Sequence, residues 1–305
     1  MRKRAMMLLT ALCGAVLIWR GGECAAAARE AVGLCLQTVI PSLFPFFVVS
    51  SLLVELGAGE LLGWLLRGMM RPLFGLGRGG AAALALGALG GYPVGARTLG
   101  ELYRRGEVSR EEAEQLLAFC NNSGPGFILG ICGGAVFRSA EVGIWLYLIH
   151  IAAALMTGIL LRRNIPFAAA APLRRRENPR FAAVFPLAVG RAFAGIGNVC
   201  SFVILFAVPG RLLGTLPAMR AASPCVRSVL CGAVELTGGI TALPCSAAGF
   251  VCCALLLGWG GASVHAQTLA VLDGSGLSVR RYFIGKALHA ALSAAIAAIV
   301  CRYIF

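Results

Sequence analysis

The chain has 305 residues, of which 59% are hydrophobic and 13% charged, and its mean hydropathy is +0.83. Soluble domains carry about 25% charged residues, so this composition excludes an ordinary soluble domain and indicates a polytopic integral membrane protein. A net charge of +14 would suggest nucleic-acid binding in a soluble protein, but most arginines here lie in short loops between apolar runs, where they set membrane orientation. We therefore expect the lipid bilayer as a partner and expect no binding of nucleic acid.

Thiol redox chemistry and metal binding are not expected either. Most of the twelve cysteines lie in apolar runs and none forms a C-x-x-C pair, so they are interpreted as small membrane residues. The histidines His150, His265 and His289 are far apart and lack nearby carboxylates. We expect no metal and no cofactor, and we leave coupling to H⁺ or Na⁺ open.

The amino terminus, residues 1–23, has the charged start and short apolar core of an N-terminal anchor or a signal-like helix. The apolar run is slightly shorter than the ~20 residues that span a bilayer core. We favour a retained anchor with its basic end in the cytoplasm and leave cleavage open.

Residues 24–163 are expected to form a first repeat unit. A helix is expected to begin near Ser109, with Glu112 as its capping-box partner. In chain order, the unit contains an apolar stretch (25–56), a basic amphipathic piece (64–78), a glycine-dense run (83–96), a charged segment (97–110), a polar interruption (119–130) and a span (142–161).

A basic linker, residues 164–180, is expected in the cytoplasm because it contains several arginines. The second unit, residues 181–305, then repeats the order of the first. It contains an apolar stretch with glycine breaks at Gly195 and Gly197, a polar interruption (232–244), an apolar run broken at 258–268 and a closing span (283–304).

The loop charges suggest how these units cross the membrane. With 97–110 and 162–180 both cytoplasmic, 80–97 becomes a re-entrant hairpin, and the second unit has the same elements upside down, with 223–245 as the opposite hairpin. The predicted fold is an all-α polytopic membrane protein with two inverted-topology repeats, each with a re-entrant hairpin and a broken transmembrane helix. This orientation places Arg280, Arg281 and Lys286 inside, whereas Arg211, Arg220 and Arg227 argue against it because they would lie outside.

The phrase "FCNNSGPGFILG" at 119–130 predicts a helix break at membrane depth. Pro125 lacks a backbone donor and its glycine neighbours allow unusual backbone angles. Unpaired backbone groups cost several kcal/mol in hydrocarbon, so such a break survives only inside protein or beside a watery cavity. It would offer free N–H groups and the side chains of Asn121, Asn122 and Ser123, beside Gly124, to a polar or anionic ligand. The alternative is an extramembrane turn.

Glu235 is the costliest residue of the second unit, because an acidic side chain at bilayer depth is disfavoured by ~2.5 kcal/mol or more. With Thr237 and Gly238 it is interpreted as a hairpin tip that binds a cation or accepts a proton. The alternative pairs it with Arg191 or Arg227 at an interface.

The remaining candidate substrate-binding residues come from the second break and the first hairpin. Ser263, His265 and Gln267 lie in the break at 258–268, where we expect them to approach the residues at 121–123 at mid-membrane. Tyr92 and Pro93 form the hairpin tip, with Arg97 as a nearby anion partner. His150 and His289 are interpreted as structural.

Four phrases in order resemble one known family: "GYPVGA" at 91–96, "CNNSGPGFILG" at 120–130, "ELTGG" at 235–239 and "GGASVHAQ" at 260–267. They resemble the sporulation integral membrane proteins of the YlbJ/SpoVV type, in the nucleoside-recognition gate domain group. The resemblance implies a permease of the outer forespore membrane that moves dipicolinic acid. The chain is shorter than a typical member, which leaves open a nucleoside or another small solute as substrate.

The expected function is therefore a membrane transporter or permease of a small organic anion. Whether the protein forms a homodimer is left open. A non-transporting sporulation membrane scaffold is the competing hypothesis. An intramembrane serine hydrolase would need a nucleophile phrase that the chain lacks, so we expect no enzyme. No nucleotide-binding glycine motif points to ATP-driven pumping.

Overall fold

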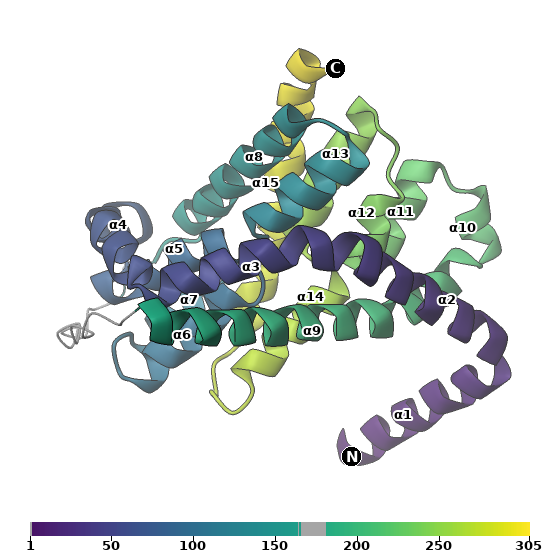
Figure 1. Cartoon of the computed structure of the whole chain (residues 1–305), viewed down its shortest axis with the longest axis horizontal. Helices are drawn as coiled ribbons and strands as arrows, with labels where there is room; N and C mark the ends of the chain where they lie inside the picture. The colour runs from purple at the N-terminus through teal and green to yellow at the C-terminus, as the bar shows by residue number, and fades with distance from the viewer. Residues whose placement is uncertain (1, 164, 166–180) are drawn as a thin grey trace.

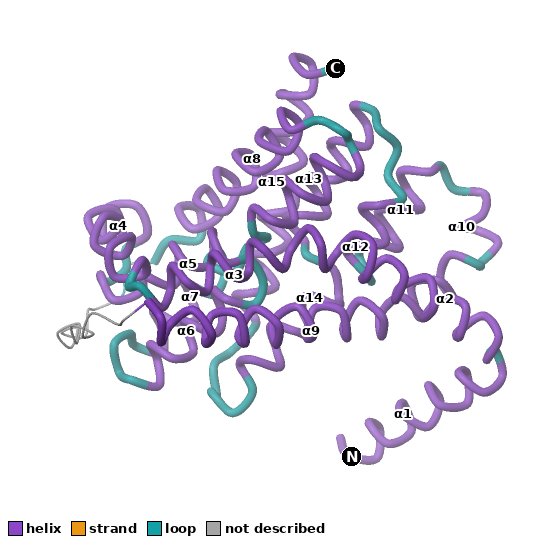
Figure 2. The backbone as a smooth tube through the Cα atoms, viewed as in Figure 1, coloured by secondary structure: helices purple, strands orange, loops and turns teal. Residues whose placement is uncertain are grey.

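The computed structural model describes residues 2–163, 165 and 181–305. No strand occurs in these ranges, and helices form nearly all of the regular structure (Figures 1 and 2). The expected all-α membrane class is confirmed. The helical segments that are long and apolar enough to cross a membrane within the described ranges are Gly21–Glu55, Ala140–Leu160, Phe181–Gly214, Ala247–Leu272 and Arg280–Ile304.

The amino-terminal third begins with α1 (Arg2–Trp19), which is followed by α2 (Gly21–Leu34), the π-helical turn η1 (Cys35–Val39) and α3 (Ile40–Glu55). The last three elements form one continuous helix although Pro41 and Pro45 lie within it. The π-helical turn ends at Val39, two residues before Pro41, so the missing N–H of the proline falls next to a shifted pattern of backbone hydrogen bonds.

This long helix runs beside α9 (Phe181–Gly214), as Figure 1 shows. The predicted breaks at Gly195 and Gly197 are wrong, because α9 remains helical through both. Gly195 serves packing instead: a Cβ there would lie 3.2 Å from a ring carbon of Phe47 on α3. A glycine in an apolar run therefore marks a close helix contact here and not an interruption.

The rest of the first unit comprises short elements and one span: α4 (Ala58–Phe74), η2 (Arg78–Gly80), α5 (Ala81–Gly90), α6 (Val94–Arg104), α7 (Arg110–Leu116), η3 (Gly126–Val136) and α8 (Ala140–Leu160). The predicted capping box is confirmed, since Glu112 N donates to Ser109 Oγ (3.2 Å) and Ser109 N donates to Glu112 Oε2 (3.0 Å). The predicted helix break is also present, because residues 121–124 are not helical.

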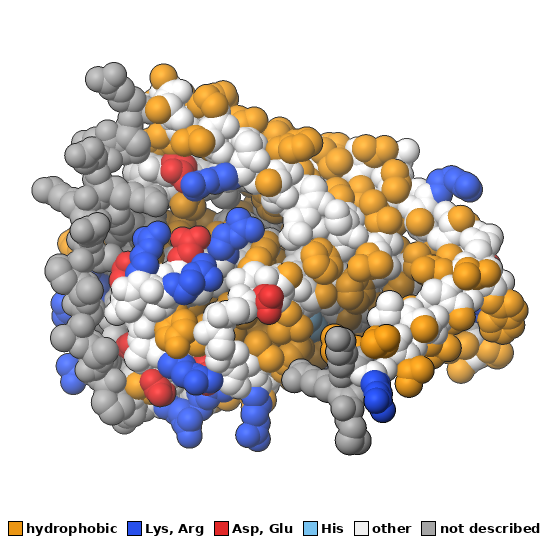
Figure 3. Space-filling view, turned by 90° about the horizontal axis from the view of Figure 1, so that it is seen from below, with side chains coloured by type: hydrophobic (Ala, Val, Ile, Leu, Met, Phe, Trp, Pro, Cys, Tyr) orange, Lys and Arg blue, Asp and Glu red, His pale blue; other side chains and the backbone are white. Residues whose placement is uncertain are grey.

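Charged side chains gather at the α6 and α7 end of the face shown in Figure 3, and much of the remainder of that face is apolar. Arg97, Arg104 and Arg105 on and after α6 are exposed. This distribution agrees with a watery or headgroup location for the segment at 97–110. The predicted linker at 164–180 lies, except for residue 165, outside the described residues.

The second unit continues with α10 (Pro217–Ala221), α11 (Pro224–Gly232), α12 (Leu236–Thr241), α13 (Ala247–Trp259), α14 (Gly261–Leu272) and α15 (Arg280–Ile304). The break expected over 258–268 is confined to the joint between α13 and α14, where Gly260 has φ +95° and Gly261 φ +73°. Two glycines suffice for this joint and no proline follows them, so Ser263, His265 and Gln267 lie on a regular helix.

Helix α15 packs against α8 and α13 in the interior. Lys286 was expected among the cytoplasmic basic residues, but its side chain is only 1% exposed. Tyr282, Lys286, His289 and Ser293 recur at helical spacing and are all buried, so they form one polar stripe facing the protein interior. Because α15 begins at Arg280, Lys286 lies almost two turns inside the span.

Candidate functional site

In the first unit, the non-helical break after α7 lies against the joint between α5 and α6. Ala96 N donates to Asn121 Oδ1 (3.3 Å), and Gly91 in the joint has φ +73°. A Cβ on Gly91 would lie 2.9 Å from Gly124 N, so the two backbones approach as only glycine permits. The α5–α6 joint therefore packs against the break and shields part of its backbone from lipid.

The second unit contains a comparable contact between the α11–α12 joint and the α13–α14 joint. Ala262 N donates to Ala233 O (2.8 Å), and Ser263 N donates to Val234 O (3.0 Å). The free N–H groups at the start of α14 therefore find partners in the carbonyls left open after α11. This mutual pairing satisfies interrupted backbone that lipid could not satisfy.

Polar side chains join the two units at these joints. Asn121 Nδ2 donates to Thr268 Oγ1 on α14 (2.8 Å), and the Tyr92 hydroxyl donates to Leu257 O on α13 (3.3 Å). The Lys286 ammonium donates to the Tyr92 hydroxyl (2.7 Å) and lies 3.5 Å from Asn121 O. One buried hydrogen-bonded network therefore links the first break to α13, α14 and α15.

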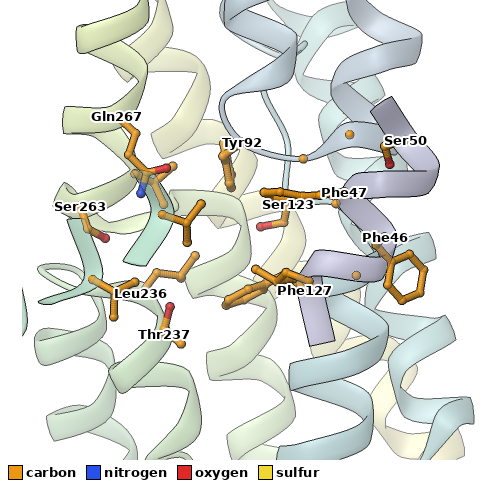
Figure 4. A pocket seen from close by; sticks show the side chains of 18 of the residues that line it. Phe46, Phe47, Ser50, Tyr92, Ser123, Phe127, Leu236, Thr237, Ser263 and Gln267 are labelled. Atoms are coloured by element: carbon orange, nitrogen blue, oxygen red, sulfur yellow. The ribbon is translucent and has the colours of Figure 1, made fainter. Parts of the chain in front are cut away.

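A pocket opens where the interrupted segments meet, and Figure 4 shows polar and aromatic side chains converging on it. Its volume is about 50 Å³, enough for water but too small for an organic solute in this conformation. The predicted site residues that line it are Tyr92, Ser123, Gly124, Glu235, Thr237, Ser263 and Gln267. Aromatic rings contributed by Phe46, Phe47 and Phe127 complete the wall.

Two polar atoms of these lining residues lack protein partners. Within the described part of the chain, Ser123 Oγ and Gln267 Oε1 are buried and form no hydrogen bond. A buried polar atom without a partner is costly, so a ligand or water that enters the pocket gains these two contacts.

The other predicted residues lie around the pocket. Asn122 faces away, toward an apolar cavity, and its Nδ2 donates to Phe119 O (2.9 Å). His265 is on α14 but does not line the pocket, and its Nδ1 lies 2.8 Å from the Tyr282 hydroxyl. Of the predicted group at 121–123, only Ser123 lines the pocket together with Ser263. Pro93, Asn121 and Gly238 flank the pocket without lining it.

Glu235 is only 4% exposed and caps the short helix α12. Its carboxylate accepts hydrogen bonds from Thr237 N (3.0 Å) and Gly238 N (2.6 Å). The alternative pairing with Arg191 is wrong, because Arg191 pairs with Glu55. Among the ion pairs of the described ranges none joins Glu235 to Arg227, so backbone N–H groups stabilise this carboxylate.

The histidines that were interpreted as structural support the site from behind. His150 on α8 accepts a hydrogen bond at Nε2 from Ser123 N (3.0 Å), and His289 Nε2 lies 2.9 Å from His150 O, so both histidines buttress the break. Lys286 was missed as a site residue. The polar stripe on α15, at helical spacing in an apolar span, is the signal that could have identified it.

Comparisons with known proteins give two matches for this chain. Residues 36–171 match the Gate family, described as nucleoside recognition. The chain is also 29% identical over 306 residues to the sporulation integral membrane protein YlbJ of Bacillus subtilis (strain 168), across 88% of this chain and 75% of that protein. This chain is thus similar to YlbJ over most of its length and contains a region that matches the Gate family. The resemblance expected from the four phrases is confirmed, and the Gate match includes both the α5–α6 joint and the break at 121–124.

Proposed function

We propose that this YlbJ-like Gate-domain protein is a transporter or facilitator of a small organic anion in sporulation, with dipicolinic acid as the first expected substrate. The observation that carries the proposal is the pocket built jointly from the two interrupted regions, with a lysine ammonium immediately behind its wall. Interrupted helices at corresponding positions of two halves are typical of transporter binding sites. The outer forespore membrane is the proposed location, in line with the sporulation role in the relative's name.

The wall chemistry suits a flat, polar solute. The rings of Phe47, Phe127 and Tyr92 offer apolar faces, while Ser123 and Gln267 offer unpaired polar atoms. The Lys286 ammonium does not line the pocket, but it donates to the hydroxyl of Tyr92, which does. It would supply positive charge for a bound carboxylate. These features support a planar aromatic carboxylate.

Transport requires the pocket to widen, because its present volume of about 50 Å³ excludes an organic solute. The bonds from Asn121 to Thr268 and from Tyr92 to Leu257 tie the two units together and are the contacts that widening must break. We propose that the pairs α5–α6 and α11–α12 act as re-entrant hairpins of two inverted repeats that rock around this pocket, with H⁺ or Na⁺ as the coupling ion. A homodimer is part of the same proposal.

A nucleoside is the second candidate substrate, and one observation favours it. Glu235 lines the pocket, and its carboxylate would repel an anion while accepting hydrogen bonds from the hydroxyl groups of a sugar. The description of the Gate family as nucleoside recognition points the same way. Competition between dipicolinate and uridine for uptake separates the two candidates.

The decisive test measures uptake of labelled dipicolinate, uridine and succinate by purified protein in liposomes. Saturable dipicolinate uptake that is lost in Lys286→Gln, and kept in the exposed control Arg104→Gln, supports the anion proposal. If no solute is taken up while a sporulation defect still follows deletion of the gene, the chain is a membrane scaffold and the transport proposal is wrong.

A further inference from the structure

A second and larger cavity lies on the far side of Glu235 from the central pocket. It has a volume of about 540 Å³ and lies between α2, α9, α11 and α12. Val203 and Glu235 line both cavities, so the two spaces adjoin. A cavity of this size accommodates a small organic solute, which the central pocket in this conformation does not.

Arginines dominate the charge of this cavity. Arg211, Arg220 and Arg227 line it together with two carboxylates, Glu30 and Glu235. Arg211 lies 3.4 Å from Glu30, and Glu235 is already bonded to the backbone of α12. Within the described ranges no ion pair involves Arg220 or Arg227, so both guanidinium groups keep their bidentate binding capacity.

Membrane orientation does not explain these arginines. Helix α9 has 34 residues and is about 51 Å long, well above the ~30 Å of a bilayer core. The basic linker precedes its first residue, whereas Arg211 lies at its last turn, so the two basic groups belong to opposite sides of a crossed membrane. The general excess of Lys and Arg in cytoplasmic loops can explain only one of these two basic groups.

We propose that this cavity is an anion vestibule in which Arg220 and Arg227 bind a small carboxylate or phosphate anion before it passes Glu235 into the central pocket. The inference rests on the proposed transport function and adds a separate binding site to it. Guanidinium groups at a cavity mouth raise the local concentration of anions and their rate of entry, and salt weakens this effect. Glu235, which lines both cavities, then separates the vestibule from the pocket.

Two kinds of ligand carry an anionic group that these arginines could bind: a soluble anion and the headgroup of an anionic lipid. The experiment uses Arg220→Gln/Arg227→Gln, with Arg104→Gln as the matched control, because Arg104 is exposed on α6 and lines none of the described cavities. Dipicolinate uptake is measured in neutral-lipid liposomes and in liposomes containing phosphatidylglycerol. Binding of dipicolinate and of inorganic phosphate to purified protein in neutral detergent is measured by calorimetry.

In neutral liposomes we expect the double variant to raise the KM for dipicolinate by about tenfold at unchanged maximal rate, and to lose the salt dependence of KM seen in the wild type. A variant effect confined to phosphatidylglycerol liposomes would assign the same anion site to lipid headgroups. Unchanged KM, salt dependence and anion binding in both lipids would overturn the vestibule. If the wild type binds dipicolinate without transporting it, and the double variant loses this binding, the transport proposal alone fails.

Discussion

The Lys286 ammonium donates a hydrogen bond to the Tyr92 hydroxyl at 2.7 Å, and joins α15 to the joint between α5 and α6. The same ammonium lies 5.1 Å from the centroid of the Tyr92 ring and 3.5 Å from Asn121 O. No carboxylate pairs with this lysine among the ion pairs of the described ranges. A positive charge on this buried lysine would be costly without a partner, and an anionic substrate in the adjacent pocket would offset that cost.

Replacing Lys286 with glutamine tests this relationship. Glutamine removes the charge and keeps hydrogen-bonding capacity, so we expect dipicolinate uptake to fall at least about tenfold, while apparent Tm stays the same or rises because a buried charge is lost. Uptake assays and thermal unfolding in detergent measure the two effects. Full dipicolinate uptake by Lys286→Gln would contradict a role of this charge in anion binding.

Substitution of Asn121 by alanine should lower stability through the contact between the two units. The side chain accepts from Ala96 N and donates to Thr268 Oγ1, so its loss leaves a buried N–H group without a partner, at a cost of about 1–3 kcal/mol. Thermal unfolding should show a lower Tm. The matched control is Asn122→Ala, which loses only a bond to nearby Phe119 and should shift Tm less.

Gly91→Ala should disrupt the joint between α5 and α6. Its Cβ would meet Gly124 N at 2.9 Å, in addition to the strain of φ +73°. Gly106→Ala has almost the same backbone strain, at φ +71°, but nothing within 4 Å of its Cβ. We expect a loss of uptake and a larger fall in Tm for Gly91→Ala, and equal effects of the two variants would show that only φ matters.

Glu235→Gln should distinguish the two candidate substrates. Removal of the charge relieves repulsion of an anion but weakens hydrogen bonding to hydroxyl groups. We expect a lower KM for dipicolinate and a higher KM for uridine in competition uptake assays. A higher KM for dipicolinate together with an unchanged KM for uridine would argue that Glu235 serves only as the cap of α12.

Local chemistry made part of this structure predictable. Pro125 with a glycine on each side predicts a helix break, and Ser109 with Glu112 predicts a helix start, so both features were found from sequence. Gly195 also suggested a break but lies in a continuous helix, where its missing side chain lets Phe47 of α3 pack closely.

The site was predictable only where chain interruptions mark it. Ser123 and Glu235 lie at interruptions, Ser263 directly follows the α13–α14 joint, and all three line the pocket. Lys286 lies in a regular helix, and its burial depends on contacts with Tyr92 and Asn121, which are more than 160 positions away in sequence. The polar stripe on α15 marks Lys286 as facing the interior, but no local pattern around residue 286 encodes which distant residues it contacts.

The most direct test of the central claim is counterflow of labelled dipicolinate into liposomes that contain the purified protein and an excess of unlabelled dipicolinate. A pocket shared by the two units that carries an organic anion predicts a transient accumulation of label above the level in protein-free liposomes, and its loss in Lys286→Gln. Label entry no faster than in protein-free liposomes, by protein that unfolds cooperatively in detergent, would contradict the account.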